Sequence, residues 1–449
     1  MTAPLFPELM LKKYNPLFTI VLSYIIIIAV GTLLLMLPSA STTDEWTPFV
    51  DAAFTATSAT TVTGLTVVDT GTHWSFFGQL VILLLIHIGG LGYMTIIASI
   101  IIIVRKRAIT ESLILGESLN TYSFKEMFLL AKSLFMVVIL LEALGALALF
   151  VNWAPLMGIK KALWFGIFHA VAAFNNAGFD LMGNYASLTN YVSDPVVNAT
   201  IIGLIIAGGL GFFVFLELVN WLTGKGVMTL HTKIVLTMTC LLIVLGAGLI
   251  IAFESSNQET LGNLPFTTKM WAALFTSVTA RTAGFNTLSM NKLTDASLFL
   301  LILLMFIGAS PGGTGGGIKT TTISVVFFAV SSYIKGHKET SIDSRTVDDT
   351  TVRKAHTIIV LTASFIVFFT FALQLTSHHG FLAVLFEVTS AFGTVGLTTG
   401  ITPTLVPAAK VILMAAMFVG RIGSLSVVLL FTRKYATRIQ FPKEHISIG

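Results

Sequence analysis

Cysteine is almost absent from this chain of 449 residues, because Cys240 is the only one. A single cysteine excludes an intrachain disulfide and a zinc site built from cysteines. Charge is scarce as well: charged residues make up 10% of the chain, against about 25% in soluble proteins. The sequence also lacks a strand, glycine-rich turn and helix unit outside its apolar runs. Any nucleotide that controls the protein must therefore be bound by a separate subunit.

The sequence consists largely of long apolar runs. Hydrophobic residues make up 55% of the chain, and the mean hydropathy is +0.89. Runs long enough to cross a bilayer recur along the whole sequence, which predicts an all-α polytopic membrane protein. The first run has no small-residue cleavage site of the kind that ends a signal peptide. The expected spans are Pro16–Met36 and residues 76–104, 127–151, 195–222, 233–253, 296–333 (interrupted), 355–375 and 407–432.

The net charge of +5 indicates membrane topology and not nucleic-acid binding. Lysine and arginine are concentrated in the loops on one side of the expected spans, including residues 105–107 and the polar linker 335–354. Cytoplasmic loops carry such an excess. We therefore expect both termini in the cytoplasm.

Four shorter apolar runs, residues 49–59, 164–174, 270–279 and 381–391, lie between pairs of long runs on the outer side. They are too short to cross a bilayer and are typical of re-entrant pore helices, whose non-helical ends must line a protein-enclosed or water-filled cavity. Each leads into a glycine, and these glycines recur about 110 residues apart, a period that marks an internal repeat. The glycines are Gly64, Gly178, Gly284 and Gly396.

The repeats predict four helix–pore helix–helix units around one central pore, or eight spans plus four re-entrant pore helices. The expected division is a cytoplasmic N-terminus at 1–14, repeat 1 at 15–108, repeat 2 at 109–225, repeat 3 at 226–345, repeat 4 at 346–433 and a cytoplasmic tail at 434–449.

Glycine accepts positive φ without steric cost, and rings of inward carbonyls can replace the hydration shell of a cation. The alternative is that these are ordinary helix-packing glycines, but their fourfold placement favours a selectivity filter that binds K⁺ through backbone carbonyls. The expected filter residues are Thr61, Val62, Thr63, Gly64, Asn175, Asn176, Ala177, Gly178, Arg281, Thr282, Ala283, Gly284, Gly393, Thr394, Val395 and Gly396.

The chain resembles the bacterial Trk/Ktr and plant HKT potassium transporters, most of all the Ktr membrane subunit. Residues 57–69, 168–179, 281–286, 386–399 and 417–423 carry this resemblance. It implies a multi-pass protein of the bacterial plasma membrane, a homodimer in membrane lipids, and gating by a cytoplasmic nucleotide-binding ring of RCK type. It also implies that glycine at the first filter position goes with potassium selectivity, while serine there goes with sodium permeation.

A glycine-rich stretch interrupts the third returning span. It does not match a phosphate-binding loop, because Ile318 precedes Lys319 where that pattern needs glycine. A simple packing break is one interpretation. The resemblance implies a flexible intramembrane gate below the filter. The expected gate residues are Gly308, Ala309, Ser310, Pro311, Gly312, Gly313, Thr314, Gly315, Gly316 and Gly317, together with Arg421.

Three charged residues lie at membrane depth. Arg421 would be costly there without a polar partner. It could extend to the inner interface, but the resemblance implies that it faces the pore and holds the gate. Arg281 and Glu387 are expected to brace the filter, as a candidate pair.

The leading function is passive, channel-like potassium uptake without a covalently bound cofactor, with Na⁺ as a candidate modulator. The alternative is a sodium- or proton-coupled potassium symporter. His87, His169, Glu142 and Glu217 are the scattered groups that could serve coupling, and no two of them have the spacing of a helical metal pair. An enzyme would need a cluster of catalytic groups at one depth, which the sequence does not offer.

Overall fold

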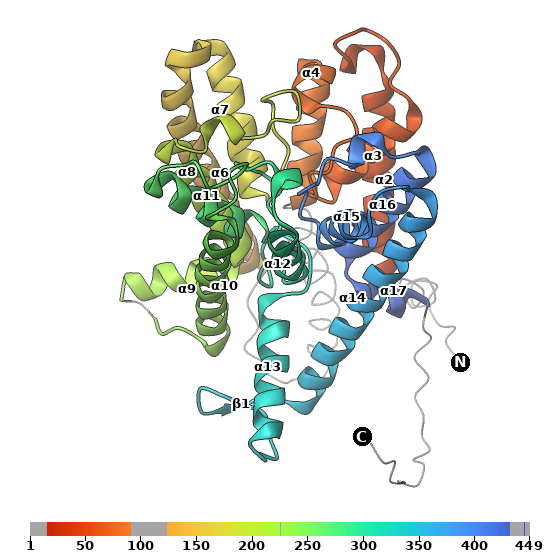
Figure 1. The fold of residues 1–449 in the computed structure, drawn as a ribbon. Helices are drawn as coiled ribbons and strands as arrows, with labels where there is room; N and C mark the ends of the chain where they lie inside the picture. The colour runs from red at the N-terminus through yellow and green to blue at the C-terminus, as the bar shows by residue number, and fades with distance from the viewer. Residues whose placement is uncertain (1–15, 91–123, 225, 432–443, 445–449) are drawn as a thin grey trace, which may run out of the picture.

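The computed structural model describes residues 16–90, 124–224, 226–431 and 444. Four units of outer helix, pore helix and inner helix follow one another around a centre (Figure 1). The first two units contain α2 (Pro16–Met36), α3 (Phe49–Thr60) and helix Phe76–Gly90, then α6 (Phe124–Met157), α7 (Ile159–Phe174) and α8 (Pro195–Leu210). The last two contain α10 (Leu230–Glu254), α11 (Phe266–Thr279) and α12 (Asp295–Phe306), then α14 (Asp349–Thr376), α15 (Phe381–Gly393) and α16 (Pro407–Ile422).

Smaller elements join these units. They are α4 (Thr70–His73), α9 (Phe212–Leu222), α13 (Thr320–Ile334), α17 (Ser424–Phe431), the strands β1 (Ser341–Ile342) and β2 (Arg345–Thr346), and the 3-10 turns η1 (Pro38–Ala40), η2 (Thr189–Tyr191), η3 (Met290–Lys292) and η4 (Thr402–Thr404).

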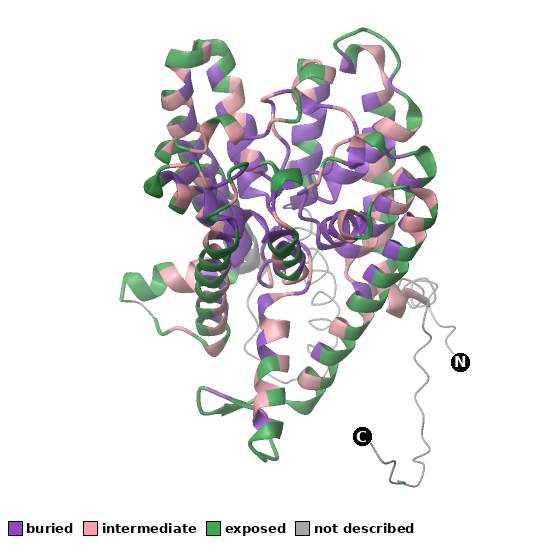
Figure 2. Cartoon of the chain, viewed as in Figure 1, coloured by how far each residue is buried: buried purple, intermediate pink, exposed green. Residues whose placement is uncertain are grey.

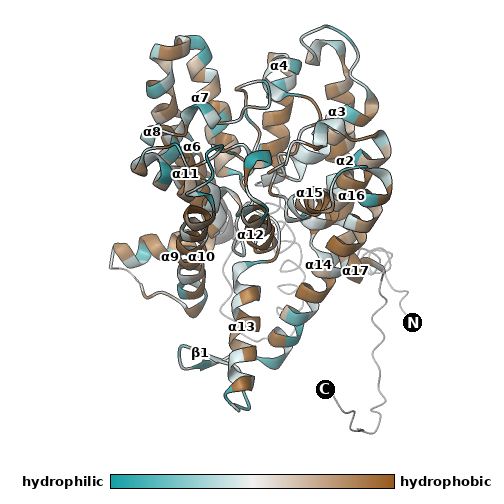
Figure 3. Ribbon diagram, viewed as in Figure 1, coloured by the Kyte–Doolittle hydropathy of each residue, from teal (hydrophilic) through white to brown (hydrophobic). Residues whose placement is uncertain are grey.

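The outer helices are covered by the rest of the protein over only a small part of their surface. In the most apolar windows of α2, α10 and α14, only 17%, 22% and 28% of the residues are buried inside the protein. These helices are nevertheless hydrophobic over much of their length (Figure 3). Apolar surface that the protein does not cover needs a bilayer to cover it. Burial is instead concentrated in the middle of the molecule (Figure 2), where the pore helices α3, α7, α11 and α15 end.

Within the described residues, four helices are long and apolar enough to span a membrane, or six if each of two bent pairs counts as one span. The bent pairs occupy the expected returning spans at 195–222 and 407–432, each of which is divided in two. α8 and α9 meet at 103° and α16 and α17 at 94°. The breaks fall at Gly211 and Gly423, with φ of 93° and 94°, a conformation that a helix cannot contain.

The third returning span is interrupted, as expected. α12 ends at Phe306, and α13 begins at Thr320 and continues away from the centre (Figure 1). The polar linker 335–354 also contains the β1–β2 hairpin, and its last residues form the first turns of α14. The hairpin turns at Asp343 and Ser344, whose positive φ values suit a tight two-residue turn.

Some expectations lie outside the described residues. These are the N-terminal segment 1–14, the inner end of the span 76–104 with its basic stop at 105–107, most of the link 109–125, and the tail 434–449 except residue 444.

Candidate functional site

The four pore helices end in the same backbone turn. Two residues before each repeat glycine, the chain adopts a left-handed conformation, with φ of 57° at Val62, 58° at Asn176, 72° at Thr282 and 51° at Thr394. The repeat glycines Gly64, Gly178, Gly284 and Gly396 also have positive φ, at 93°, 68°, 84° and 94°. A non-glycine residue rarely adopts this conformation, so its fourfold recurrence marks one shared structure.

The four turns close into a ring. A methyl group added to each glycine would collide with the carbonyl oxygen of the residue before the glycine in the next repeat: Gly178 meets Ala283 O at 2.9 Å and Gly284 meets Val395 O at 2.6 Å. Gly64 contacts Ala177 O in the same way, and Gly396 contacts Thr63 O. The order runs from repeat 1 through 2, 3 and 4 and back to 1. The structure thus brings the predicted filter segments together at one point.

The ring carbonyls, those of Thr63, Ala177, Ala283 and Val395, are buried with their residues. Within the described part of the chain, no hydrogen-bond donor reaches these oxygens. Nearly all buried backbone carbonyls have a partner. Four that converge without one form a site that a cation can complete.

Side chains on the pore helices hold the turns in place. Gly64 N donates to Ser58 Oγ and Gly396 N to Ser390 Oγ, each at 3.1 Å. In repeat 3, Thr279 Oγ1 donates to Phe285 O at 2.5 Å. The ring geometry is therefore fixed from behind by hydroxyl groups, as preorganised cation coordination requires.

Glu387 and Arg281 do not form the expected pair. Glu387 accepts hydrogen bonds from Thr398 Oγ1 at 2.7 Å and from Thr402 Oγ1, so it braces the chain after the fourth filter segment. Arg281 lies behind the ring with residues of α8 and α10 and with Ala309, and its Nε has no partner among the described residues. Sequence order alone could not distinguish these separate surroundings.

Gly393, another expected filter residue, lies in the last turn of α15. A methyl group there would lie 2.9 Å from Met305 O. Gly393 therefore lies where α15 contacts α12, next to the side chain of the ring residue Val395.

Asn175 lies directly before the second filter turn and connects it to an outer helix. Its Nδ2 donates to Glu142 Oε1 on α6 at 3.0 Å. His87 Nδ1 lies 3.7 Å from the same carboxylate oxygen. Of the titratable groups that are scattered along the sequence, Glu142 thus contacts a predicted filter residue. Nowhere in the described ranges do three His, Cys, Asp or Glu side chains gather as metal ligands.

The predicted gate residues form a closed loop, since Gly308 N donates to Ile318 O at 2.9 Å. The loop packs against the broken end of α8, where Ser310 N donates to Gly209 O at 3.0 Å and Thr314 N to Gly208 O at 3.1 Å. The last carbonyls of a helix have no partner within the helix. The break at Gly211 therefore gives the loop a place to bind.

The same loop touches the pore helices and filter turns. Thr314 Oγ1 donates to Phe174 O at 3.2 Å, and Gly316 N donates to Thr394 Oγ1 at 3.1 Å. A methyl group on Gly315 would collide with Thr282. The loop lies directly against the segments that form the ring.

Two cationic side chains donate hydrogen bonds to the loop. Arg421 donates through Nη1 to Thr314 O and through Nη2 to Gly89 O at 2.5 Å, while Lys319 Nζ donates to Gly315 O at 2.6 Å. Arg421 therefore connects repeat 4 to the loop 308–317 and to the inner helix of repeat 1. The oxygens that accept from Arg421 are neutral, so no ion pair has to be broken when the guanidinium leaves them.

Sequence reasoning missed three glycines and one lysine. Gly89, Gly208 and Gly420 contact the carbonyls of Thr60, Phe174 and Phe392 so closely that no side chain would fit. These carbonyls belong to residues four before the filter glycines of repeats 1, 2 and 4. The recurrence of a glycine after each filter could have identified these positions, but Lys319 has no such signal.

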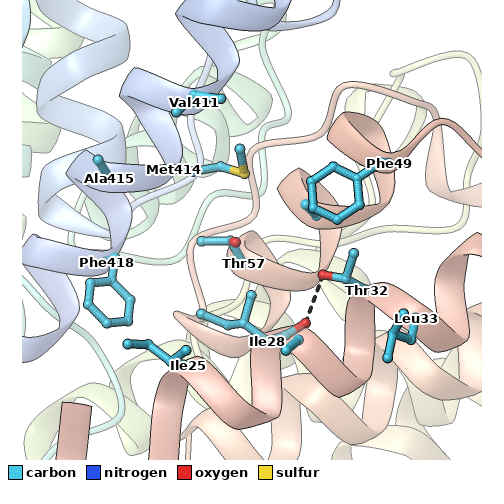
Figure 4. Close-up of a pocket in the computed structure, with 12 residues that line it drawn as sticks. Ile25, Ile28, Thr32, Leu33, Phe49, Thr57, Val411, Met414, Ala415 and Phe418 are labelled. Atoms are coloured by element: carbon cyan, nitrogen blue, oxygen red, sulfur yellow. Dashed lines mark hydrogen bonds between the residues drawn. The ribbon is translucent and has the colours of Figure 1, made fainter. Parts of the chain in front are cut away.

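A cavity of about 550 Å³ lies between helices of repeats 1 and 4 (Figure 4). It is lined by α2, α3 and α16, with Ile25, Phe49, Met414 and Phe418 on its walls. Its lining is almost wholly apolar and cannot replace the hydration shell of an ion.

Comparisons with known proteins find that this chain is similar to cation transport proteins. The family model described as "TrkH: Cation transport protein" matches residues 10–438. The chain is 42% identical over 440 residues to Ktr system potassium uptake protein B of Bacillus subtilis (strain 168), covering 97% of each chain. It is 37% identical over 448 residues to the potassium/sodium uptake protein NtpJ of Enterococcus hirae, covering 98% of each. The crystal structure of the potassium transporter TrkH from Vibrio parahaemolyticus matches with a TM-score of 0.75 at 18% identity, over 94% of this chain and 86% of that one.

Proposed function

The chain belongs to the TrkH family of cation transport proteins, and on this premise we propose that it is the ion-conducting membrane subunit of a bacterial potassium uptake system. It is a transporter and not an enzyme. Similar chains from Bacillus subtilis and Vibrio alginolyticus carry the name potassium uptake protein, which supports K⁺ as the transported ion.

One observation carries the proposal. The carbonyls of Thr63, Ala177, Ala283 and Val395 converge at the point where the four repeat glycines meet, and no donor from the described ranges binds them. Carbonyl rings of this kind replace the water around an alkali ion. The pore helices add to this effect, because their C-terminal ends carry partial negative charge.

Selectivity for potassium should be moderate. Only one glycine per repeat is shared, so there are fewer ordered carbonyl rings to discriminate between ions than in a filter with two. We expect Na⁺ to pass when K⁺ is absent. The potassium/sodium name of the similar Enterococcus hirae protein is consistent with this expectation.

The loop 308–317 is the gate of this pore in the proposal, and Arg421 and Lys319 hold it closed. A homodimer in the plasma membrane, with both termini in the cytoplasm, would present the β1–β2 hairpin and the basic cytoplasmic loops to a nucleotide-binding ring of RCK type. The word "system" in the names of similar proteins supports a partner of some kind. The nucleotide then acts on that partner and not on this chain.

Coupled symport is the second candidate. The contact of Glu142 with the filter residue Asn175 favours it, since a titratable group at a filter can couple proton and cation movement. Reversal potentials measured in reconstituted bilayers separate the two functions. In potassium solutions without sodium, a passive pore reverses at the potassium equilibrium potential at every pH. The reversal potential of a proton-coupled carrier shifts with the proton gradient, and a sodium-coupled carrier passes no potassium current until sodium is added.

Complementation tests the function in cells. The gene should restore growth of a potassium-uptake-deficient bacterium at low potassium, more strongly with a regulatory partner gene than without it. Normal membrane expression without any growth at low potassium would contradict a role in potassium uptake.

A further inference from the structure

A second cavity, of about 310 Å³, lies beside the gate loop. Its walls come from the loop itself, from α14 and from the bend between α16 and α17. Water occupies about 30 Å³ per molecule, so the cavity has room for a small polyatomic ion with some of its water. Lys354, exposed near the start of α14, lies at its edge.

The charges around this cavity have one sign. Lys319, Lys354 and Arg421 line it, and no aspartate or glutamate of the described residues does. The hydrogen bonds of Lys319 and Arg421 go to neutral oxygens. Partly buried cations normally have an anionic partner, because removing charge from water is costly.

Backbone groups add to the positive potential. Lys319 and Thr322 line the cavity where α13 begins, and Ser424 and Ser426 line it where α17 begins. The first amide groups of a helix attract anions, as does the helix dipole. Thr322 N already donates to Lys319 O at 2.9 Å, so α13 contributes its dipole. Two helix N-termini and three cationic side chains thus surround one space.

We propose that this cavity binds a phosphate-type oxyanion and that its occupancy loosens the gate. The anion competes with the carbonyls of Thr314 and Gly315 for Arg421 and Lys319, and it cancels positive charge beside the cation pathway. Both effects raise cation flux. The link to the gate rests on the proposed function, but the binding itself does not.

Two sources offer this chemistry: the headgroup of an anionic lipid and free phosphate in the cytoplasm. Basic pockets between helices on the cytoplasmic side commonly bind lipid headgroups. The apolar side chains of Ile358, Leu425 and Leu429 on the same walls would suit an attached acyl chain.

Binding is tested with the purified full-length chain in two settings. Native mass spectrometry measures retention of phosphatidylglycerol against phosphatidylcholine, and thermal unfolding in phosphatidylcholine nanodiscs measures the effect of inorganic phosphate. Lys354→Gln should weaken binding by about fivefold, the value of one basic side chain near an anionic headgroup. Arg353→Gln is the matched control, since Arg353 is the exposed neighbour on α14 and does not line the cavity.

Loss of phosphatidylglycerol retention in Lys354→Gln alone supports the site and identifies a lipid ligand. Loss of the phosphate-induced stabilisation in Lys354→Gln alone supports it with a free ligand. If neither probe distinguishes Lys354→Gln from the wild type, or if both variants lose binding equally, the site is refuted.

Flux into vesicles tests the effect on the gate. The ligand identified by binding should raise K⁺ flux in the wild type and in Arg353→Gln, and less in Lys354→Gln. An equal rise in all three would reflect general surface charge and would overturn the gating claim. Absence of K⁺ flux under every condition would count against the proposed function, while the binding result would stand by itself.

Discussion

At Gly64 the backbone has φ of 93°, and a side chain there would meet Ala177 O and the Cα of Gly178. Gly64→Ser should therefore displace the first filter turn and enlarge the ring. We expect this displacement of the ring carbonyls to lower the K⁺/Na⁺ permeability ratio by about tenfold, which corresponds to about 1.4 kcal/mol of lost discrimination. Bi-ionic reversal potentials in reconstituted vesicles measure this ratio.

Gly400 provides the matched control for that substitution. Its φ is 92°, nearly that of Gly64, but nothing lies within 4 Å of an added methyl group. Gly400→Ser should carry the backbone strain without changing selectivity. If both substitutions leave the permeability ratio unchanged, Gly64 does not set the ion preference.

Arg421 joins the gate loop to two repeats through Thr314 O and Gly89 O. Hydrogen bonds from a charged group contribute about 1.5–3 kcal/mol, so Arg421→Gln should raise basal flux roughly tenfold in the absence of a regulatory partner. Arg421→Lys keeps the charge but cannot reach both carbonyls, and it should give an intermediate flux. Equal flux in the wild type and both variants would mean that Arg421 does not hold the gate.

At this scale, the sequence predicted which glycines come together, because a period of about 110 residues is visible without coordinates. It could not predict the partners of Arg281 and Glu387. Their neighbours come from α8 and from Thr398 and Thr402, and no pattern along the chain ties an isolated charge to one surface.

At the scale of the elements, the broken end of α8 supplies the carbonyl oxygens that hold the loop 308–317 in place. The loop binds Gly208 O and Gly209 O at the end of α8, and it lies against Thr394 of the fourth filter turn. Deleting residues 309–316 should open the pathway and increase K⁺ flux, measured as ⁸⁶Rb⁺ uptake into vesicles. A fall in uptake with normal folding and membrane insertion would show that the loop is not a barrier.

The two helix bends offer a finer test of the same element. A methyl group on Gly211 would lie 2.5 Å from Pro311 O in the gate loop, whereas one on Gly423 has only Ser426 Oγ near it, at 3.9 Å. Gly211→Ala should therefore raise basal ⁸⁶Rb⁺ uptake more than Gly423→Ala does. Gly211 and Gly423 have nearly the same φ, so the two substitutions cause similar backbone strain. Equal ⁸⁶Rb⁺ uptake in both variants would show that the contact between Gly211 and the loop does not control ion flux.

The pore helices could be predicted closely from the sequence. The run 49–59 corresponds to α3 at Phe49–Thr60, and the run 164–174 ends where α7 ends, because both are short apolar runs that stop at a turn. The bends at Gly211 and Gly423 could not be predicted. A single glycine is tolerated inside a helix, and at Gly211 the gate loop, distant in sequence, packs against the break.

For the whole molecule, the proposed topology places Glu45 outside the cell and Lys338 inside. Cys240, the only cysteine, is exposed and can be replaced by serine to give a background without reactive thiols. In that background, a cysteine at position 45 should react with a membrane-impermeant maleimide in intact cells, and one at position 338 only after permeabilisation. The reverse pattern would invert the orientation that the basic loops predict.

The central claim is that four carbonyl oxygens from one chain coordinate the transported ion. The most direct measurement is the anomalous difference density of crystals grown in Tl⁺, an ion that replaces K⁺. We predict a peak on the common axis, between the carbonyl oxygens of Thr63, Ala177, Ala283 and Val395, that is lost in Gly64→Ser. A transport-active protein whose Tl⁺ peaks all lie away from these oxygens would contradict the account.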